Sequence, residues 1–256
     1  MNRSVPGRAA LASVAVVLLV ATATACGASA ADDDRPEHRS FALDGTALTI
    51  DSDDSALEIV AVDGRPADRI EVTRWFEGSV VAGEDPKVTW SMEDDRLKLR
   101  VHCSGVIADC SAKHRIEVPR GVTVSVEDGD GSVRASGFRD ALSIRTGDGS
   151  VRVTDTSGPL RLRTGDGSVR ADVSSRQVSS RTGDGSAHLR LAAVPDRVDA
   201  VGGDGSVTID LPRAAYRVTT SSGDGSVDVS VPRDETSAHV VSARTGDGSV
   251  TIRTAN

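Results

Sequence analysis

Hydrophobic and polar residues alternate with a period of two through most of the chain after residue 40. Asp, Gly, Pro and Ser interrupt this alternation and leave short runs at 47–50, 57–62, 69–73, 87–90, 96–101 and 114–118. Successive side chains of a strand point to opposite faces of its sheet, so the pattern predicts β-strands that bury one face. No window after residue 25 has the spacing of an amphipathic helix, and we therefore expect an all-β protein.

The C-terminal half of the chain is an array of one short unit. The tetrapeptide Gly-Asp-Gly-Ser occurs seven times, and its first residues are Gly129, Gly147, Gly165, Gly183, Gly203, Gly223 and Gly246. These residues are 18, 18, 18, 20, 20 and 23 positions apart, which indicates a repeated supersecondary structure. Alternating runs lie on both sides of each copy, as in 142–146 and 151–153, so each unit is predicted to be two strands joined at a corner. We expect the corner glycines to adopt positive φ, because glycine has no Cβ to oppose it.

Two architectures agree with this unit. In a parallel β-solenoid each repeat is one coil, and its strands stack on those of the next coil at about 4.8 Å. In the alternative, each Asp-Gly is the turn of an antiparallel hairpin, which would bring like charges together by placing Arg145 opposite Arg152. Stacked coils place valine on valine, and this identity at a short period favours the solenoid. The predicted fold is a right-handed parallel β-solenoid of about seven coils, residues 121–256, preceded by a β-rich capping segment, residues 41–120.

The first 25 residues have the features of a signal peptide. Arg3 and Arg8 form a basic start, and the apolar stretch 9–21 is too short to cross a bilayer of about 30 Å. The Ala-Thr-Ala-Cys that ends at Cys26 resembles the cleavage box of bacterial lipoproteins, in which the cysteine becomes the lipidated N-terminus. With this lipid the mature protein would be anchored to the outer face of the bacterial cell membrane. An ordinary secretory cleavage at 28–30 would instead discard Cys26 and release the protein.

The mature chain is acidic. The whole chain has 30 Lys and Arg against 38 Asp and Glu, a net charge of −8, and loss of segment 1–25, with two arginines and no acidic residue, makes it −10. An acidic domain without a basic stripe binds nucleic acid poorly, so we expect no nucleic-acid partner. Residues 26–40 include three consecutive aspartates and lack apolar periodicity, and they are predicted to form a flexible acidic tether.

Cys103 and Cys110 lie between two predicted strands, with six residues between them. In an oxidising compartment such a pair is typical of a disulfide that closes a short loop. A Cys2His2 metal site with His102 and His114 is an alternative, but neighbouring residues of a strand, such as 102 and 103, point to opposite faces. The disulfide is therefore the favoured prediction, and no metal is expected.

The repeat resembles that of a known group of proteins. The recurring [S/T]-G-D-G-S-V-x-[V/A/I] unit, the export signal and the preceding all-β segment with two close cysteines are similar to the adhesin family of bacterial envelope β-strand-repeat proteins, a domain of unknown function. The resemblance covers residues 41–256. It implies a β-solenoid-like fold and an exported location, and it carries no catalytic residues to this chain.

The seven corner aspartates would form a column along one side of a solenoid. They are Asp130, Asp148, Asp166, Asp184, Asp204, Asp224 and Asp247. In one interpretation each carboxylate accepts backbone N–H groups at its own corner, and its charge is offset by flanking arginines at 134, 145, 152, 163, 170, 181 and 244. In the other, the column binds calcium, which prefers hard oxygen ligands. The calcium-binding β-roll pattern recurs every nine residues, whereas here a corner comes once per coil, so the first interpretation is favoured.

Enzyme motifs are absent from the repeats. Gly-Asp-Gly-Ser differs from the Gly-x-Ser-x-Gly of a nucleophile elbow, and the glycines lack the pattern of a phosphate-binding loop. A carbohydrate-active enzyme is a remote alternative, because Phe138 and Tyr216 are the only aromatic residues of the array and sugar rings pack on aromatic platforms. We predict a non-enzymatic surface, adhesion or interaction module without a cofactor, with a calcium-dependent binding protein as the alternative.

The predicted partners follow from the two ends of the molecule. A lipid on Cys26 would hold the N-terminus at the membrane. Because the chain ends seven residues after the last Gly-Asp-Gly-Ser, we expect the final coil to expose strand edges near Ile252 and Arg253. That edge is a predicted contact surface for an envelope protein or for a second copy of the chain.

Overall fold

The structure, a computed structural model, describes residue 30 and residues 33–255. The predicted signal peptide, 1–25, and the predicted lipidation site, Cys26, lie outside the described residues. In the described part, 21 strands form two sheets, sheet A with 11 strands and sheet B with 10. None of these residues belongs to a helix long and apolar enough to cross a membrane.

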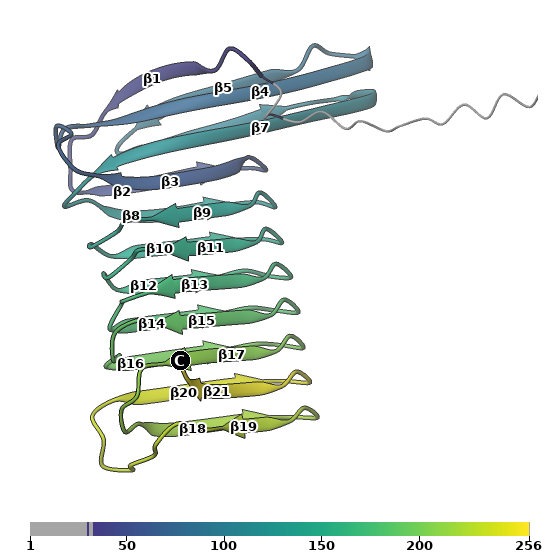
Figure 1. Ribbon diagram of the computed structural model, residues 1–256. Coiled ribbons are helices and arrows are strands. Elements are labelled where there is room, and N and C mark those ends of the chain that lie inside the picture. The colour runs from purple at the N-terminus through teal and green to yellow at the C-terminus, as the bar shows by residue number, and fades with distance from the viewer. Residues whose placement is uncertain (1–29, 31–32, 256) are drawn as a thin grey trace, which may run out of the picture.

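The repeats build a parallel stack in which every coil contributes one strand to each sheet (Figure 1). The sheet B strands are β8 (Thr123–Asp128), β10 (Leu142–Thr146), β12 (Leu160–Arg163), β14 (Gln177–Arg181), β16 (Arg197–Val201), β18 (Arg217–Ser222) and β20 (Val240–Thr245). The sheet A strands are β9 (Val133–Ser136), β11 (Val151–Thr154), β13 (Val169–Val173), β15 (Ala187–Leu191), β17 (Val207–Leu211), β19 (Val227–Val229) and β21 (Val250–Thr254). All their pairings are parallel, and Val151 stacks on Val133 and Val169. The predicted parallel solenoid is confirmed and the hairpin alternative is wrong, while the handedness stays a prediction.

The segment before the repeats continues the same two sheets. β2 (Ala47–Ser52) and β3 (Ala56–Val62) pair in parallel with β8 and β9 and form a coil without the Gly-Asp-Gly-Ser corner. β6 (Arg96–His102) and β7 (Gly105–Pro119) stack on that coil, again in parallel. The end of the stack is covered by β4 (Arg69–Gly83), which is antiparallel to β7, by β5 (Lys87–Glu93), which is antiparallel to β6, and by β1 (Glu37–Ala42).

The predicted tether is shorter than residues 26–40. β1 begins at Glu37 and pairs antiparallel with β4. The Glu37 carboxylate also lies 2.7 Å from Nη2 of Arg74 on that strand. Residues 37–40 are polar, but their backbone groups complete the edge of sheet A, and backbone pairing does not require apolar side chains.

The hydrophobic core lies between the two sheets. Val151 and Val153 of sheet A and Leu160 and Leu162 of sheet B are each at most 2% exposed. The residues between them in sequence point outward, as the period-two pattern predicts. The aliphatic side chains therefore hold the coils together, and the outer faces of both sheets remain polar.

The coil order differs from the sequence order at the C-terminal end. β21 lies between β17 and β19, and β20 lies between β16 and β18. The last coil of the chain is therefore inside the stack, and the expectation of an exposed edge near Ile252 and Arg253 is wrong: Ile252 is 0% exposed. The open edges at this end belong to β18 and β19.

Core composition accounts for this exchange. The inserted coil places Val241, Ala243, Val250 and Ile252 inward, and all four are fully buried. The coil formed by β18 and β19 has polar residues at two inward positions, which are half-buried. Burying the more apolar coil between two neighbours removes more apolar surface from water, so the more polar coil occupies the end.

The corner glycines serve close contact between coils and not an unusual backbone conformation. None of the Gly-Asp-Gly-Ser glycines has a positive φ; among the described residues the glycines with positive φ are Gly64, Gly121 and Gly137. A Cβ on Gly149 would overlap the backbone oxygen of Gly131, and a Cβ on Gly167 would overlap that of Gly149. The prediction of positive φ is wrong because stacking, and not turning, is what excludes a side chain here.

Cys103 and Cys110 are joined by a disulfide. It lies where β6 and β7 meet. His114 is 0% exposed and points into the core, where burial, with a contribution from the charge of Arg74, lowers its pKa to about 4. The two cysteines and His114 therefore do not converge with His102, and the alternative Cys2His2 site is not formed.

Candidate functional site along the corners

The corner aspartates follow one edge of the stack, at the loops seen at the right end of the coils in Figure 1. Backbone hydrogen bonds fix this alignment: the N–H of Gly147 donates to the oxygen of Gly129 at 2.6 Å, and five further corners repeat the bond. Because the last coil is inserted, the order along the edge is Asp130, Asp148, Asp166, Asp184, Asp204, Asp247 and Asp224.

Aspartate carboxylates at the N-terminal end of this edge bind the coil that follows. Oδ1 of Asp130 accepts the backbone N–H of Asp148 at 3.2 Å, and Oδ1 of Asp148 accepts that of Asp166 at 3.4 Å. Asp54, in the corner between β2 and β3, accepts the N–H of Asp130 at 3.3 Å and so begins the series. The donors thus come from the neighbouring corner. The sequence predicts donors from the same corner instead. These carboxylates help to stack the coils.

A metal site is not assembled by these carboxylates. Within residue 30 and residues 33–255, no group of three or more His, Cys, Asp or Glu side chains is placed to hold a metal ion. The repeat supplies one carboxylate per coil, and calcium takes six to eight oxygen ligands. The calcium-binding alternative stays a prediction that the geometry does not favour.

Three arginines form a row on the outer face of sheet A, here called the sheet A arginine row: Arg134, Arg152 and Arg170. They are direct neighbours on β9, β11 and β13, and His188 of β15 follows them. All three are exposed, and none of their side chains has a hydrogen bond or ion pair with another described residue. Corner serines lie beside them and line the same groove of about 350 Å³, namely Ser132, Ser150, Ser168 and Ser186.

A second row lies on the outer face of sheet B and is called the sheet B arginine row: Arg145, Arg163 and Arg181. Its members are direct neighbours on β10, β12 and β14 and line a groove of about 790 Å³. Acidic residues stand at both ends of this row. Glu127 is the neighbour of Arg145 on β8, and Asp199 lies 3.6 Å from Nη2 of Arg181.

Neither row forms an ion pair with a corner aspartate in the described part of the chain. The sequence predicts that these arginines offset the aspartate charges, but they do not do so by direct contact. In the coils of Asp148 and Asp166, the corner aspartate is accompanied by two arginines, one on each sheet. The middle of an otherwise acidic molecule therefore presents unpaired positive charge on both faces.

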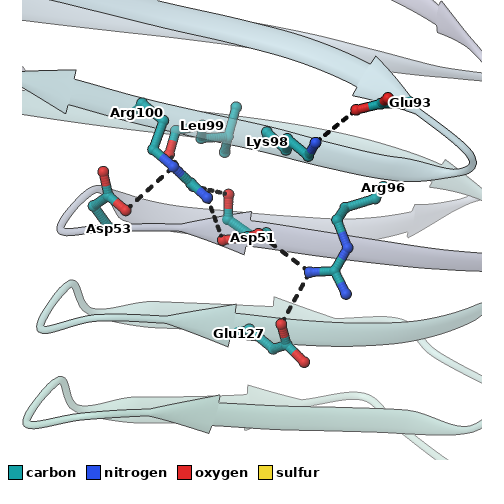
Figure 2. A network of polar contacts seen from close by, with 8 residues as sticks. All are labelled: Asp51, Asp53, Glu93, Arg96, Lys98, Leu99, Arg100 and Glu127. Atoms are coloured by element: carbon teal, nitrogen blue, oxygen red, sulfur yellow. Dashed lines mark hydrogen bonds and ion pairs between the residues drawn. The ribbon is translucent and has the colours of Figure 1, made fainter.

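The coils before the repeats pair their charges instead (Figure 2). Nη1 of Arg96 lies 3.1 Å from Oδ2 of Asp51 and 3.0 Å from Oε2 of Glu127, and it bridges two neighbouring strands. Arg100 holds the other oxygen of Asp51 at 2.8 Å and contacts Asp53 at 3.4 Å. The bonds from Glu127 first, and then from Asp51, raise the pKa of Arg96 above its usual value.

Asp128 departs from the repeat and was not singled out by the sequence. It stands opposite Thr146, at a position that is threonine in several coils, and the hydroxyl of Thr146 binds the corner of the preceding coil at the oxygen of Gly129, 2.7 Å away. Both carboxylate oxygens of Asp128 are buried without a hydrogen-bond partner. Burial, together with the charges of Asp54, Asp130 and Asp53, raises its pKa to about 7, and the nearby hydroxyl of Ser52, which lacks hydrogen-bond geometry, opposes the shift.

Asp210 is a second polar residue that sequence reasoning missed. It is 3% exposed on β17, although it occupies an outward position of the alternating run Val207–Leu211, where the pattern predicts an exposed residue. Its carboxylate lies 2.6 Å from Nε of Arg253 and 2.7 Å from Nε2 of His188. Burial raises the pKa of Asp210, but these two bonds outweigh burial and hold it below its usual value. The ion pair with Arg253 joins β17 to β21 of the inserted coil.

The chain belongs to the family described as Toastrack DUF4097, whose model matches residues 94–256, more than half of the chain. This match confirms the family resemblance inferred from the repeat. No curated protein matches the chain.

Solved structures from three bacteria are similar to this chain. A candidate adhesin from Bacteroides fragilis has 11% identity and a TM-score of 0.45, and the match covers 90% of this chain and all of that one. A candidate adhesin from Parabacteroides merdae has 12% identity and a TM-score of 0.43, and the match covers 87% of this chain and 97% of that one. A candidate cell adhesion protein from Clostridium sporogenes has 12% identity and a TM-score of 0.35, with 86% of this chain and all of that one covered.

Proposed function

We propose that this member of the Toastrack DUF4097 family is a non-enzymatic interaction module of the cell envelope, exported and anchored by a lipid on Cys26. The observation that carries the proposal is the pair of arginine rows, which face outward; among the described residues only Arg181 of the six has an ion-pair partner, Asp199. Catalysis needs unlike groups that converge on one point, whereas these rows repeat one group at the coil spacing. A repeated surface is suited to holding an extended or repeating partner.

The location rests on separate features. The basic and apolar start of the chain, the box that ends at Cys26 and the disulfide between Cys103 and Cys110 are all typical of an exported protein. The intact mass of the membrane-extracted protein tests the anchor. We expect the mass of a chain that starts at Cys26 with its acyl groups, and expect Cys26→Ala to abolish it. A mature N-terminus beyond Cys26 would contradict the anchor.

The interaction itself is tested with the mature protein extracted in detergent and with isolated cell envelopes that lack it. We expect saturable binding that weakens as salt is raised, because charge contacts on an open surface are screened. Replacing all six arginines of the two rows by glutamine is expected to abolish binding. Binding that survives this replacement would contradict the proposal, and a thermal melt of the variant verifies that it is folded.

A further inference from the structure

We infer that the sheet A arginine row binds a linear acidic polysaccharide with one carboxylate per sugar residue, laid across β9, β11 and β13 along the axis of the stack. This inference rests on the proposed function and names the partner of that surface. Its basis is the set of free donors on one face: Arg134, Arg152 and Arg170 have no partner in the described residues. Each coil adds a corner serine to the same groove.

The donors suit a carboxylate. A guanidinium group binds a carboxylate with two parallel hydrogen bonds, and a hydroxyl beside it can donate a third. The side chains of Ser132, Ser150 and Ser168 make no hydrogen bond within the described residues, so they are available for this role. The groove offers each anion one arginine and one serine. The arginines of the other row lie on the other sheet and do not meet those of this row at one point. Such a surface holds a single small anion weakly and gains affinity when successive anions are linked.

The spacing selects among polyanions. Neighbouring strands place successive arginines about 4.8 Å apart. An extended acidic peptide repeats its side chains on one side at about 6.6 Å, and a DNA strand repeats its phosphates at about 3.4 Å along the axis. An extended chain of uronic acids rises per residue by one pyranose ring and its bridging oxygen, which is close to the strand spacing, so its carboxylates match successive coils when the glycosidic torsions turn neighbouring rings to the same side. A neutral polysaccharide is disfavoured, because the two aromatic residues of the array, Phe138 and Tyr216, are buried.

The sheet B arginine row has the same charge but a different setting. Glu127 and Asp199 stand at its two ends, and Asp51 and Asp128 line its groove. Beyond the sheet A row, in contrast, Glu58 is already engaged by Arg115 and Lys113, and the exposed Asp172 of β13 lies outside the groove that the row and the corner serines line. An acidic polymer therefore meets less repulsion on sheet A, and the sheet B row is a matched control of equal charge.

The experiment measures binding of polygalacturonate to the mature protein in detergent, beside its fully methyl-esterified form and double-stranded DNA. We expect binding of polygalacturonate only, weakened by salt. Replacing Arg134, Arg152 and Arg170 by glutamine should lower the affinity at least about tenfold. The same replacement of the sheet B row should change it less than about threefold. The single variant Arg152→Gln, expected to lose about threefold, serves if the triple variant does not fold.

Several results would overturn the inference: no binding of polygalacturonate, equal binding of DNA or of the methyl ester, or equal losses from the two triple variants. Envelope binding separates this inference from the proposed function. If envelopes bind through the arginines while polygalacturonate does not, the polysaccharide is wrong and the interaction module stands. If neither binds, both are wrong.

Discussion

The outer face of sheet B has two parts that use one fold in opposite ways. Lys98, Asp51 and Glu127 are successive neighbours in the coils around β2, and Arg96 joins the two carboxylates (Figure 2). From the neighbour of Glu127 onward, the same column continues as Arg145, Arg163 and Arg181. Opposite charges pair in the first part, and one charge is repeated in the second.

This difference shows which positions the fold constrains. Stacking requires aliphatic residues inside and glycines at the corners, and it leaves the outward columns free. Like charges directly opposite each other on neighbouring strands destabilise a sheet, so the arginine rows do not serve stability. The charge pairs stabilise the N-terminal coils, and the unpaired rows leave the middle coils open to a partner.

Gly167→Ala should have the largest effect, because it breaks the stacking that both parts share. Its Cβ would overlap the backbone oxygen of Gly149, so the coils must separate locally. We expect a loss of more than about 3 kcal/mol in the free energy of unfolding, measured by urea denaturation. Asp53→Ala is the control, since it adds no Cβ to a corner and removes only a contact with Arg100 that is largely exposed; about 1 kcal/mol or less is expected there. Equal effects would show that the corners tolerate side chains.

Asp128→Thr should remove a pH dependence at the boundary between the two parts. The folded pKa of Asp128, about 7, lies above its ordinary value of 3.8, so the folded state binds the proton more tightly. The penalty is therefore absent at low pH, grows as the pH rises above about 4, and is complete above about 7. At pH 8 the variant should be more stable by up to about 3 kcal/mol, and at pH 4 the difference should vanish. Urea denaturation at pH 4, 6 and 8 measures this, and a difference that does not change with pH would contradict it.

Arg96→Ala should weaken the paired part. The guanidinium bridges Asp51 and Glu127 at a partly exposed position, so we expect a small loss in the free energy of unfolding that shrinks further in high salt. Arg161→Ala is the matched control, because Arg161 is exposed on β12 and its side chain makes no hydrogen bond or ion pair with another described residue. Equal losses for the two variants would show that the network adds nothing.

Arg163→Glu should give the repeated part the charge pairing that the paired part has. The new carboxylate would lie between Arg145 and Arg181 and replace two repulsive contacts with two attractive ones. We expect a gain of about 0.5 to 1 kcal/mol at low salt, from the same denaturation curves. Because the change is on sheet B, binding of polygalacturonate should persist. A loss of stability would mean that the row is already neutralised by something bound to it.

Calcium should have the smallest effect. The corner carboxylates of Asp130 and Asp148 already accept backbone N–H groups, and each coil offers one carboxylate. Thermal melts in calcium and in chelator are therefore expected to coincide. A shift of several degrees would revive the calcium-binding alternative.

Some residues of the site could be predicted from the sequence and others could not, and the reason is physical. The corner aspartates could be found because they repeat, whereas Asp128 and Asp210 occur once and acquire their environment from strands distant in the sequence. Asp210 is buried under Arg253, which is 43 residues away, and no local pattern announces that pair.

By itself, the sequence determined the inward alternation, the two-strand unit and the parallel stack, because these depend on side-chain period and on the identity of successive repeats. Only the tertiary structure decided the position of the last coil, since the choice depends on comparing the apolar surface that two complete coils would expose. It also decided that the corner glycines admit contact between coils, that Asp130 and Asp148 bind the next corner, and that only Arg181 of the two arginine rows has an ion-pair partner among the described residues. Each of these is a distance between separate coils, and a linear pattern does not contain it.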